Sequence, residues 1–299
     1  MPVWSAEVEI EEPLVRRLLA RFPELDLRSL RPLAEGWDNS VWLVDDRYAF
    51  RFPRRKVAVP LLEREIDVLP KLAALLPLPI PRPEFVGRPD GDYAWPFFGC
   101  ELIPGVEAGD ADLHDGARIA VGLELAGFLR ALHSVELHLP LDPNARADSV
   151  KRASMAREEL AELARLGVWR APPEVDAVLA QAEALPPPES PVVCHGDLHF
   201  RHLLVSGTRA SGVIDWGDVC VADRAIDLPL LWSFVPAAGR AAFLDAYGPV
   251  NDAQLVRARV LAVQLCAVLA HYGRVEGHAG VEREGVAGLE RALDGRLGT

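Results

Sequence analysis

The spacing of apolar residues divides the chain into a first part that reads mainly as strands and a second part that reads mainly as helices. In the first part, short runs alternate between apolar and polar residues, as strands with one buried face do. Behind an opening amphipathic helix, this pattern predicts a mostly antiparallel sheet with one helix. The expected elements are a helix over 6–21, two strands and a glycine-containing turn within 33–44, a strand over 48–52, a helix over 60–76 that starts at Pro60, and strands near 85–87 and 97–102.

Beyond residue 103 the pattern becomes mainly helical, and Ile103-Pro-Gly105 forms a natural boundary. We therefore predict an α+β fold with two lobes, residues 1–103 and residues 104–299. Two short apolar runs, each ending in an aspartate beside a glycine, interrupt the helices of the second lobe. The expected helices lie around 115–135, 149–166, 174–184, 224–234, 237–247, 252–272 and 281–294.

Composition limits the possible classes of function. The chain has 299 residues, half of them apolar, which is enough to bury a large core. Its formal net charge of −12 argues against a nucleic-acid-binding protein, which usually presents a basic face. From residue 101 onward there are 28 acidic and 18 basic side chains, so the acidity lies mainly in the second lobe. A cationic substrate would be attracted by this field, although ordinary solubility explains the acidity equally well.

Cysteine usage and hydropathy indicate a cytoplasmic protein. Cys100, Cys194, Cys220 and Cys266 lie far apart in apolar surroundings without a CxxC pair, which favours buried free thiols over disulfides or a zinc site. The N-terminal sequence is acidic and lacks the apolar core of a signal peptide. The longest apolar stretch, residues 260–270, reads as too short to span a bilayer, so no membrane partner is expected.

The most informative feature is a pair of segments, Val192–His199 and Gly212–Asp218. Each is a strand-like run that ends in an aspartate beside a glycine, and glycine permits the tight turn that exposes a side chain at a strand end. Two such strands project Asp197 and Asp215 into one cleft. Phosphoryl transfer uses a carboxylate to orient and deprotonate the attacking hydroxyl and another to hold magnesium. Read singly, each residue also fits a capping or turn aspartate.

Three histidines near Asp197 suggest a rival interpretation. His195, His199 and His202 together with Asp197 form a possible metal-hydrolase cluster, because imidazole and carboxylate groups bind zinc readily. Their spacing, however, brings them to one face only on a continuous helix, and Gly196 argues against a helix here. We therefore prefer the phosphoryl-transfer interpretation.

A second group of residues lies in the first lobe. Arg51 on the third strand can reach nucleotide phosphates, and Glu65 on the following helix can hold it by a charge-assisted pair, although such residues are often solvated surface groups. Gly36, Asn39 and Ser40 lie in the first hairpin, where backbone N–H groups can cover phosphates. The chain contains neither GxxxxGK[ST] nor GxGxxG nor GxSxG, so these motifs do not indicate a P-loop enzyme, a dinucleotide-binding protein or a serine hydrolase.

Taken together, these segments resemble the aminoglycoside phosphotransferase family, the antibiotic-kinase branch of the protein-kinase-like fold. The resemblance covers about residues 30–270. Its most specific parts are HGDLHxxHLLV (195–205) and GVIDWGD (212–218). The supporting parts are EGWDNSVWLV (35–44), FRFPRR (50–55), LEREIDVL (62–69) and ELIPG (101–105).

The resemblance implies a role for each matching residue. Asp197 takes the position of the catalytic base and Asp215 that of the aspartate that binds Mg²⁺. Arg51 and Glu65 take the positions of the basic strand residue and its helix partner. The family binds ATP or GTP between its lobes, and the backbone segment that pairs with the purine falls on Glu101 and Ile103. Ser40 would lie near the phosphates, and two further acidic positions with a structural role fall on Asp223 and Asp227.

Two positions depart from the family pattern. Most members carry asparagine five residues after the catalytic aspartate as a second magnesium ligand, whereas this chain has His202. Magnesium prefers oxygen ligands, so His202 points to unusual metal binding, action through water, or tolerance of manganese. Macrolide phosphotransferases are similar in carrying histidine there, which shifts the expected substrate toward macrolides. Arg51 replaces the more usual lysine but keeps the charge and the affinity for phosphate.

The sequence thus predicts a small-molecule kinase that transfers the γ-phosphate of ATP or GTP to a hydroxyl of an antibiotic-like or metabolite substrate. Macrolides and aminoglycosides are the candidate acceptors, and antibiotic resistance is the corresponding role. Residues 1–103 would form the nucleotide-binding lobe, and residues 104–299 would carry the catalytic loop and the substrate pocket. The alternative is a nucleotide-binding pseudokinase with a regulatory role, and position 202 discriminates between the two.

Overall fold

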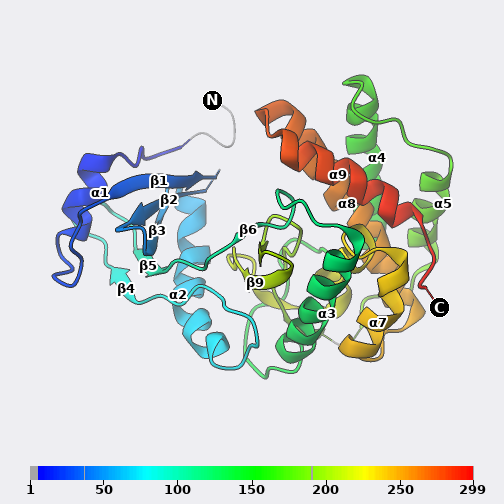
Figure 1. The fold of residues 1–299 in the computed structure, drawn as a ribbon, viewed down its shortest axis with the longest axis horizontal. Coiled ribbons are helices and arrows are strands. Elements are labelled where there is room, and N and C mark those ends of the chain that lie inside the picture. The colour runs from blue at the N-terminus through cyan, green and yellow to red at the C-terminus, as the bar shows by residue number, and fades with distance from the viewer. Residues whose placement is uncertain (1–5, 37, 190, 299) are drawn as a thin grey trace. The chain divides into compact units, whose positions relative to one another are not determined.

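The computed structural model describes residues 6–36, 38–189 and 191–298 of the chain (Figure 1). The chain separates into two compact units. The first comprises residues 1–75 and 79–103, and the second comprises residues 76–78 and 104–299. Each unit has its own cluster of buried apolar side chains.

The first unit is built on a five-stranded sheet in which every neighbouring pair is antiparallel, as the alternating pattern predicts. Asp45 and Asp46 turn the chain between the second and third strands with φ angles of 53° and 51°. Two successive left-handed residues give the turn that matches the twist of a hairpin, and aspartate tolerates this conformation. In spatial order the strands are β1 (Leu30–Glu35), β2 (Asn39–Val44), β3 (Tyr48–Pro53), β5 (Phe97–Glu101) and β4 (Phe85–Gly87).

Two α-helices accompany this sheet. The helix α2 (Val59–Ala73) follows a short 3₁₀ turn, η1 (Lys56–Ala58), close to the range that the sequence predicts. The opening helix α1 (Glu12–Leu19) is shorter than the predicted 6–21. Pro13 explains the difference, since proline fits the first turn of a helix but breaks its interior. The turn between β1 and β2 includes Trp37, which lies outside the described residues.

Aromatic rings form the core of the first unit. Phe50, Phe52 and Phe97 are fully buried, and the rings of Phe52 and Phe97 stack with their centroids 4.8 Å apart. Gly99 on β5 lies directly opposite Phe50 on β3, so the ring of Phe50 occupies the space above the glycine. The large rings of one strand therefore require the absence of a side chain on its neighbour.

The second unit is mainly helical, as predicted, with the 25-residue α8 as its longest described helix. Asn251 and Gln254 cap α8 reciprocally through side-chain and backbone hydrogen bonds. The helix predicted around 224–234 forms as two segments, because Pro229 starts a new helix there. The described helical segments are α3 (Asp115–Leu132), α4 (Ser149–Arg165), α5 (Glu174–Ala180), η2 (Gln181–Ala184), η3 (Arg224–Asp227), α6 (Pro229–Ser233), α7 (Ala237–Tyr247), α8 (Asp252–Glu276) and α9 (Ala279–Leu293).

The helix α8 is longer than the apolar stretch that the sequence defines. By length and composition alone it could cross a membrane, so the expectation that this segment is too short is wrong for the helix as formed. However, 67% of its most apolar window is buried inside the protein. Packing against α4 and α9 accounts for its apolar character.

Two small antiparallel sheets hold the loops of the second unit. The strand β7 (Pro191–Cys194) pairs with β10 (Cys220–Asp223), and β8 pairs with both β6 and β9. The apolar pattern predicts β7 and β9 but misses the other three, which are only two to four residues long. The three-stranded sheet consists of β6 (Val106–Glu107), β8 (Leu203–Ser206) and β9 (Arg209–Val213).

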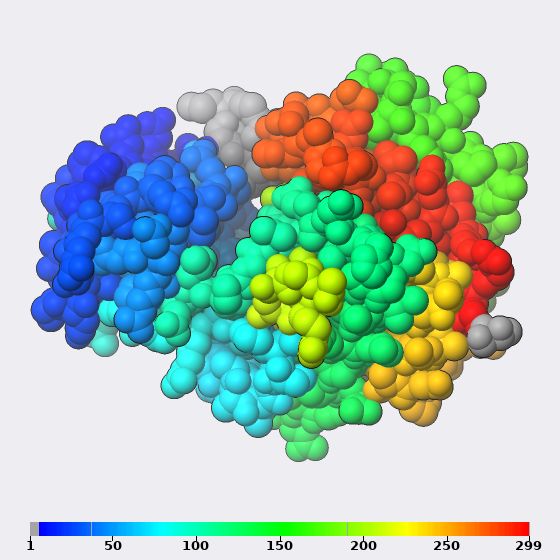
Figure 2. Space-filling model, in the orientation of Figure 1, coloured from blue at the N-terminus to red at the C-terminus, as the bar shows by residue number. Residues whose placement is uncertain are grey.

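The turn between β8 and β9 lies at the surface over α3, where Figure 2 shows it as a yellow-green patch on green. Glu124 of α3 holds it in place, because its carboxylate accepts the backbone N–H of Ala210 at 2.6 Å and pairs with Arg209. The hairpin of β8 and β9 is therefore fixed to a helix at its turn, the end opposite to the HGD and IDW segments.

The four cysteines are buried free thiols, one in the first unit and three in the second. Cys194 and Cys220 lie opposite each other on β7 and β10 without a disulfide. Burial raises the pKa of Cys100, Cys220 and Cys266 to about 12. Each thiol is therefore protonated and packed as a small apolar group.

We predict that Gly99→Ala destabilises the protein by about 2 kcal/mol, the usual cost of overpacking a core. A Cβ atom at this position would lie 2.4 Å from two ring carbons of Phe50, a ring that is fully buried. Urea unfolding followed by tryptophan fluorescence measures the change. Gly91→Ala is the matched control, because a Cβ there has nothing within 4 Å. Equal midpoints for the two variants would contradict this account of the core.

Candidate active site

The two aspartates singled out by the sequence stand on tightly constrained backbone. After β7 the chain turns at Gly196, whose φ is +89° and whose missing Cβ would lie 2.3 Å from the carbonyl oxygen of Asp218. Only glycine fits such a close approach, and the turn delivers Asp197 to the loop. Asp215 follows β9 with φ +64°, a left-handed conformation that aspartate tolerates better than most residues.

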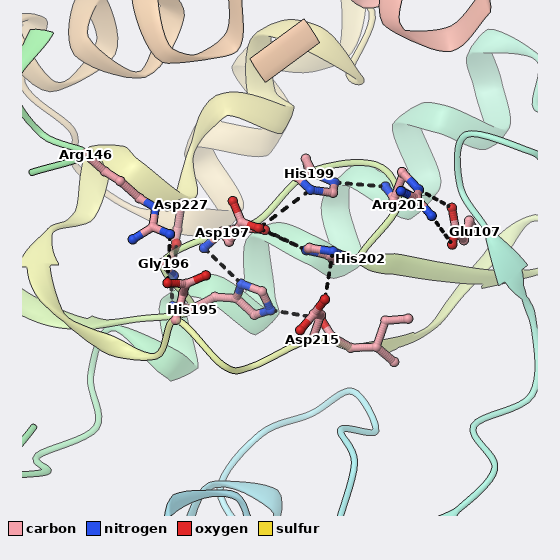
Figure 3. Close-up of polar contacts among 12 residues, drawn as sticks. Glu107, Arg146, His195, Gly196, Asp197, His199, Arg201, His202, Asp215 and Asp227 are labelled. Carbon is pink, nitrogen blue, oxygen red and sulfur yellow. Dashed lines mark hydrogen bonds and ion pairs between the residues drawn. The ribbon is translucent and has the colours of Figure 1, made fainter. Parts of the chain in front are cut away.

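His202 joins these two aspartates (Figure 3). Its Nδ1 lies 2.7 Å from the backbone oxygen of Asp197 and 3.8 Å from the Asp197 carboxylate. Its Nε2 lies 3.4 Å from the carboxylate of Asp215. Because a carbonyl oxygen only accepts hydrogen bonds, Nδ1 carries the proton. In neutral His202 the lone pair of Nε2 therefore faces the carboxylate of Asp215, and the two form a donor pair for a cation.

His199 also belongs to this group. Its Nε2 lies 3.8 Å from the Asp197 carboxylate, and its ring centroid lies 3.8 Å from that of His202. Potential ligand atoms of Asp197, His199 and His202 lie within 4.8 Å of one another. Asp197, His199 and His202 thus converge without a continuous helix, contrary to the expectation from their spacing. A turn, in which the N–H of His202 donates to the carbonyl of His199 at 2.9 Å, brings the two rings together.

His195 does not join the cluster. Its Nε2 lies 3.0 Å from the carbonyl oxygen of Ile214, and its ring packs against Trp216 with centroids 4.6 Å apart. Burial lowers the pKa of His195. This histidine is therefore neutral and ties the HGD turn to the segment that carries Asp215, which positions the two aspartates relative to each other.

The Asp197 carboxylate lies in a mixed field. Burial raises its pKa above 3.8, while the positive charge of Arg146 opposes this shift. Arg146 is itself held by two carboxylates, at 2.8 Å from Asp218 and 2.9 Å from Asp142. A carboxylate whose pKa is raised is suited to accept a proton from a neighbouring hydroxyl.

A buried carboxylate fixes the turn before Asp197. Asp227 is fully buried and accepts the backbone N–H groups of His195 at 2.7 Å and Gly196 at 2.9 Å. His133 Nε2 lies 3.2 Å from the same carboxylate. Burial alone would raise the pKa of Asp227, but the hydrogen bonds from His133 and Gly196 outweigh it and the pKa is lowered. Asp227 is therefore ionised and holds the loop by charge-assisted hydrogen bonds.

Asp223 performs a similar task in the neighbouring 3₁₀ turn. Its carboxylate accepts the backbone N–H groups of Ala225 at 2.9 Å and Glu189 at 3.0 Å, and it lies 3.3 Å from Arg257. Both acidic positions for which the resemblance implies a structural role thus hold backbone rather than face open space.

The remaining predicted residues lie in the first unit. Arg51 Nη1 on β3 lies 3.1 Å from Glu65 Oε1 on α2, and only 1% of the Glu65 side chain is exposed. Ser40 is buried, and its hydroxyl accepts the indole N–H of Trp42 at 3.1 Å. Glu101 ends β5 with an exposed side chain, and Ile103 is partly buried two residues further on.

Sequence reasoning missed several residues of this site, among them Arg146 and Asp218. Arg146 lies in an irregular loop before α4 and belongs to no motif, so no local signal marks it. Asp218 closes the GVIDWGD segment, and its place beside Gly217 was a signal that could have identified it. Both matter because they set the charge around Asp197.

The antiparallel sheet of the first unit, the helical second unit and the paired aspartates define a kinase-like phosphotransferase. Residues 29–261 match the Phosphotransferase enzyme family, and the chain belongs to that family. An aminoglycoside 3′-phosphotransferase of Streptomyces fradiae is 36% identical over 184 residues, which cover 56% of this chain and 67% of that enzyme. The resemblance found in the motifs is thereby confirmed, as is the assignment to small-molecule kinases.

Solved structures show the same fold. The GDP complex of wild-type aminoglycoside 2′-phosphotransferase-IIIa superposes with a TM-score of 0.69 at 22% identity, covering 95% of this chain and 99% of that one. A macrolide 2′-phosphotransferase from Brachybacterium faecium gives a TM-score of 0.59 at 23% identity, covering 92% and 97%. The predicted fold class is confirmed.

We predict that Asp227→Asn lowers the free energy of unfolding by about 2–3 kcal/mol at neutral pH, the usual contribution of hydrogen bonds to a buried charge. Because the pKa of Asp227 is lowered below 3.8 in the folded state, this stability is fully present above that value. It is lost as the pH falls toward the folded pKa. The stability gap between wild type and variant should therefore narrow below about pH 4, which urea titrations across pH measure.

The matched control is Asp245→Asn, an exposed carboxylate on α7. It should leave both the stability at neutral pH and its pH dependence unchanged. A variant at position 227 that is as stable as this control would show that Asp227 does not hold the loop.

Proposed function

We propose that this phosphotransferase transfers the γ-phosphoryl group of ATP or GTP to a hydroxyl of a small molecule. The convergence of Asp197 and Asp215 on His202 carries the proposal. The acceptor oxygen would attack the γ-phosphorus as the bond to the bridging oxygen breaks, and the nucleoside diphosphate would leave with that electron pair. The hydroxyl proton would pass to Asp197, whose raised pKa favours its capture.

The donor set fits a divalent metal ion. Asp215 offers a carboxylate oxygen, the ligand that Mg²⁺ prefers, and neutral His202 offers Nε2 beside it. These two residues would hold the ion, and when bound it would neutralise the charge on the β- and γ-phosphates. Imidazole is a softer ligand than the amide of asparagine, so the pair also suits Mn²⁺.

The first unit would bind the nucleotide. Arg51, held by Glu65, would contact phosphates, and the backbone at Glu101 and Ile103 would pair with the purine. Ser40 would lie on the sheet beside these phosphates. Its hydroxyl accepts the indole N–H of Trp42, so its role would be to position this part of the sheet. Complexes of structural neighbours with GDP and ADP support a purine nucleotide as the co-substrate. Residues 1–103 would thus form the nucleotide-binding lobe and 104–299 the catalytic lobe.

The acceptor would be an antibiotic-like molecule or a metabolite, handled in the cytoplasm. Relatives named for aminoglycoside, viomycin and macrolide phosphotransfer support the class of hydroxyl acceptors and a role in resistance. A screen of nucleotide consumption with ATP and with GTP, against aminoglycosides, macrolides, sugars and hydroxy acids, tests the proposal. Consumption that no acceptor stimulates would count against it.

We predict that Asp197→Asn lowers turnover by roughly 10²–10⁴-fold, the usual contribution of a positioned base. Binding of the nucleotide should persist, because the asparagine keeps the shape of the side chain. Diphosphate release measures turnover and calorimetry measures nucleotide binding, with Asp245→Asn as the control. Near-normal turnover would remove Asp197 from the role of base.

We predict that His202→Asn lowers the ratio of Mn²⁺-supported to Mg²⁺-supported turnover by about tenfold, within the range found when the surroundings of a metal are altered. The reason is that asparagine replaces a nitrogen ligand by an oxygen ligand. Steady-state assays with each metal at saturation measure the ratio. An unchanged ratio would show that His202 does not contact the ion, and transfer that appears only in the variant would indicate a pseudokinase.

A further inference from the structure

A cavity of about 340 Å³ opens beside the Asp197 carboxylate within the second unit. Gly196 and Asp197 form one end of it, and the first turns of α4 and the middle of α8 form its walls. Its volume lies at the small end of the usual range for ligand sites, roughly 300–1,000 Å³. Because it borders the proposed base, this cavity is the natural place for the acceptor.

The cavity is cationic although the chain is acidic. Arg146, Lys151 and Arg152 line it, and Asp197 is the only acidic residue among the described residues of its lining. The chain as a whole carries a net charge of −12. A local excess of positive charge in an acidic protein therefore calls for a specific explanation.

Arg152 is the buried cation of this cavity. It is only 9% exposed, and within the described part of the chain no carboxylate lies within 4 Å of its guanidinium group. Its Nη2 donates to the carbonyl of Asn144 at 2.7 Å, while its Nε is buried without a hydrogen-bond partner. A buried cation that no carboxylate pairs with directly is costly, so an anion supplied from outside would complete the site. Burial and the charge of Arg146 lower the pKa of Arg152, although the charges of nearby aspartates partly oppose this shift.

The position of Arg152 at the start of α4 makes its positive charge still more costly. Lys151 and Arg152 lie in the first turn of α4, where the helix dipole disfavours cations and no acidic residue is present. Asp148 caps this end by accepting the backbone N–H of Lys151 at 3.0 Å. The ammonium group of Lys151 reaches the carbonyl of Asn144 at 3.4 Å. Arg146, by contrast, is already paired with Asp142 and Asp218.

The rest of the lining indicates the body of the ligand. Met155 and Leu261 present apolar surface, and Gln264 has a buried amide oxygen without a hydrogen-bond partner. A substrate with a short carbon frame would cover the apolar surface, and a hydrogen-bond donor on it would pair with the Gln264 oxygen.

We infer that the cavity binds a hydroxyl-bearing organic anion, whose carboxylate or phosphate group contacts Arg152 and Lys151 while its hydroxyl reaches Asp197. This inference rests on the proposed kinase function and narrows its acceptor to small sugar acids, sugar phosphates or hydroxy acids. The hydroxyl oxygen gains the phosphoryl group, the nucleoside diphosphate departs, and the proton passes to Asp197. Polycationic aminoglycosides would face Lys151 and Arg152, which have no direct carboxylate partner among the described residues, so charge disfavours them.

Binding of four matched sugars tests the inference directly. Calorimetry on the full chain compares glucuronate and glucose 6-phosphate with neutral glucose and cationic glucosamine. The anions should bind at least about tenfold more tightly than the other two, since charge-assisted pairs are the strong ones. Comparing the two anions shows whether a carboxylate or a phosphate is preferred. Equal binding of all four sugars, or no binding of either anion, overturns the inference.

Variants locate the effect. Arg152→Gln should weaken anion binding by about tenfold or more and leave glucose unchanged. Lys151→Gln, at an exposed position, should act in the same direction and serves if the buried variant unfolds. Arg157→Gln, an exposed arginine further along α4, is the control and should change nothing. Loss of anion binding in the control as well would overturn the assignment to this cavity.

Turnover separates this inference from the kinase proposal. If the best acceptor is an anion and Arg152→Gln raises its KM while kcat changes little, both stand. If a neutral or cationic acceptor is phosphorylated with a KM that Arg152→Gln does not alter, the inference fails and the kinase proposal stands. If the anions bind but no acceptor is phosphorylated, the charge selectivity of the cavity stands and the kinase proposal fails.

Discussion

The arrangement of the site depends on one buried interaction. The backbone N–H groups of His195 and Gly196 donate hydrogen bonds to the Asp227 carboxylate. Where β7 ends, these N–H groups have no strand to pair with and need an acceptor. A buried carboxylate in turn needs donors to remain ionised. The two requirements satisfy each other, so the turn that delivers Asp197 is held without any contact to Asp197 itself.

Charge organises the region around this turn. Acidic residues fix the loops by collecting backbone and guanidinium groups, as Asp223 and Asp218 do. Cations, in contrast, gather in the cavity on the other side of Asp197. The overall acidity of the chain therefore gives a misleading picture of the cavity, because a field summed over the surface differs from the field inside a small concave site. Charge at the site follows from which side chains meet there.

The sequence predicted those parts of the fold and site that depend on neighbouring residues. Asp197 and Asp215 could be found because each lies in a continuous motif, and the long helices could be found from their spacing. The cation Arg152 could not, since it meets Asp197 only through the path of the chain around α4. The approach of His199 to His202 depends on a turn that spacing rules do not describe. Prolines moved two helix limits, at Pro13 and Pro229, and the short strands β6, β8 and β10 left too little pattern to recognise.

The buried thiols can report local unfolding in each of the two units. Cys100 belongs to the first unit, whereas Cys194, Cys220 and Cys266 belong to the second, and all four are shielded from solvent. A sulfhydryl that is both protonated and enclosed reacts with an alkylating reagent only after its surroundings come apart. The order in which these sulfurs become labelled therefore records which half of the protein loosens first.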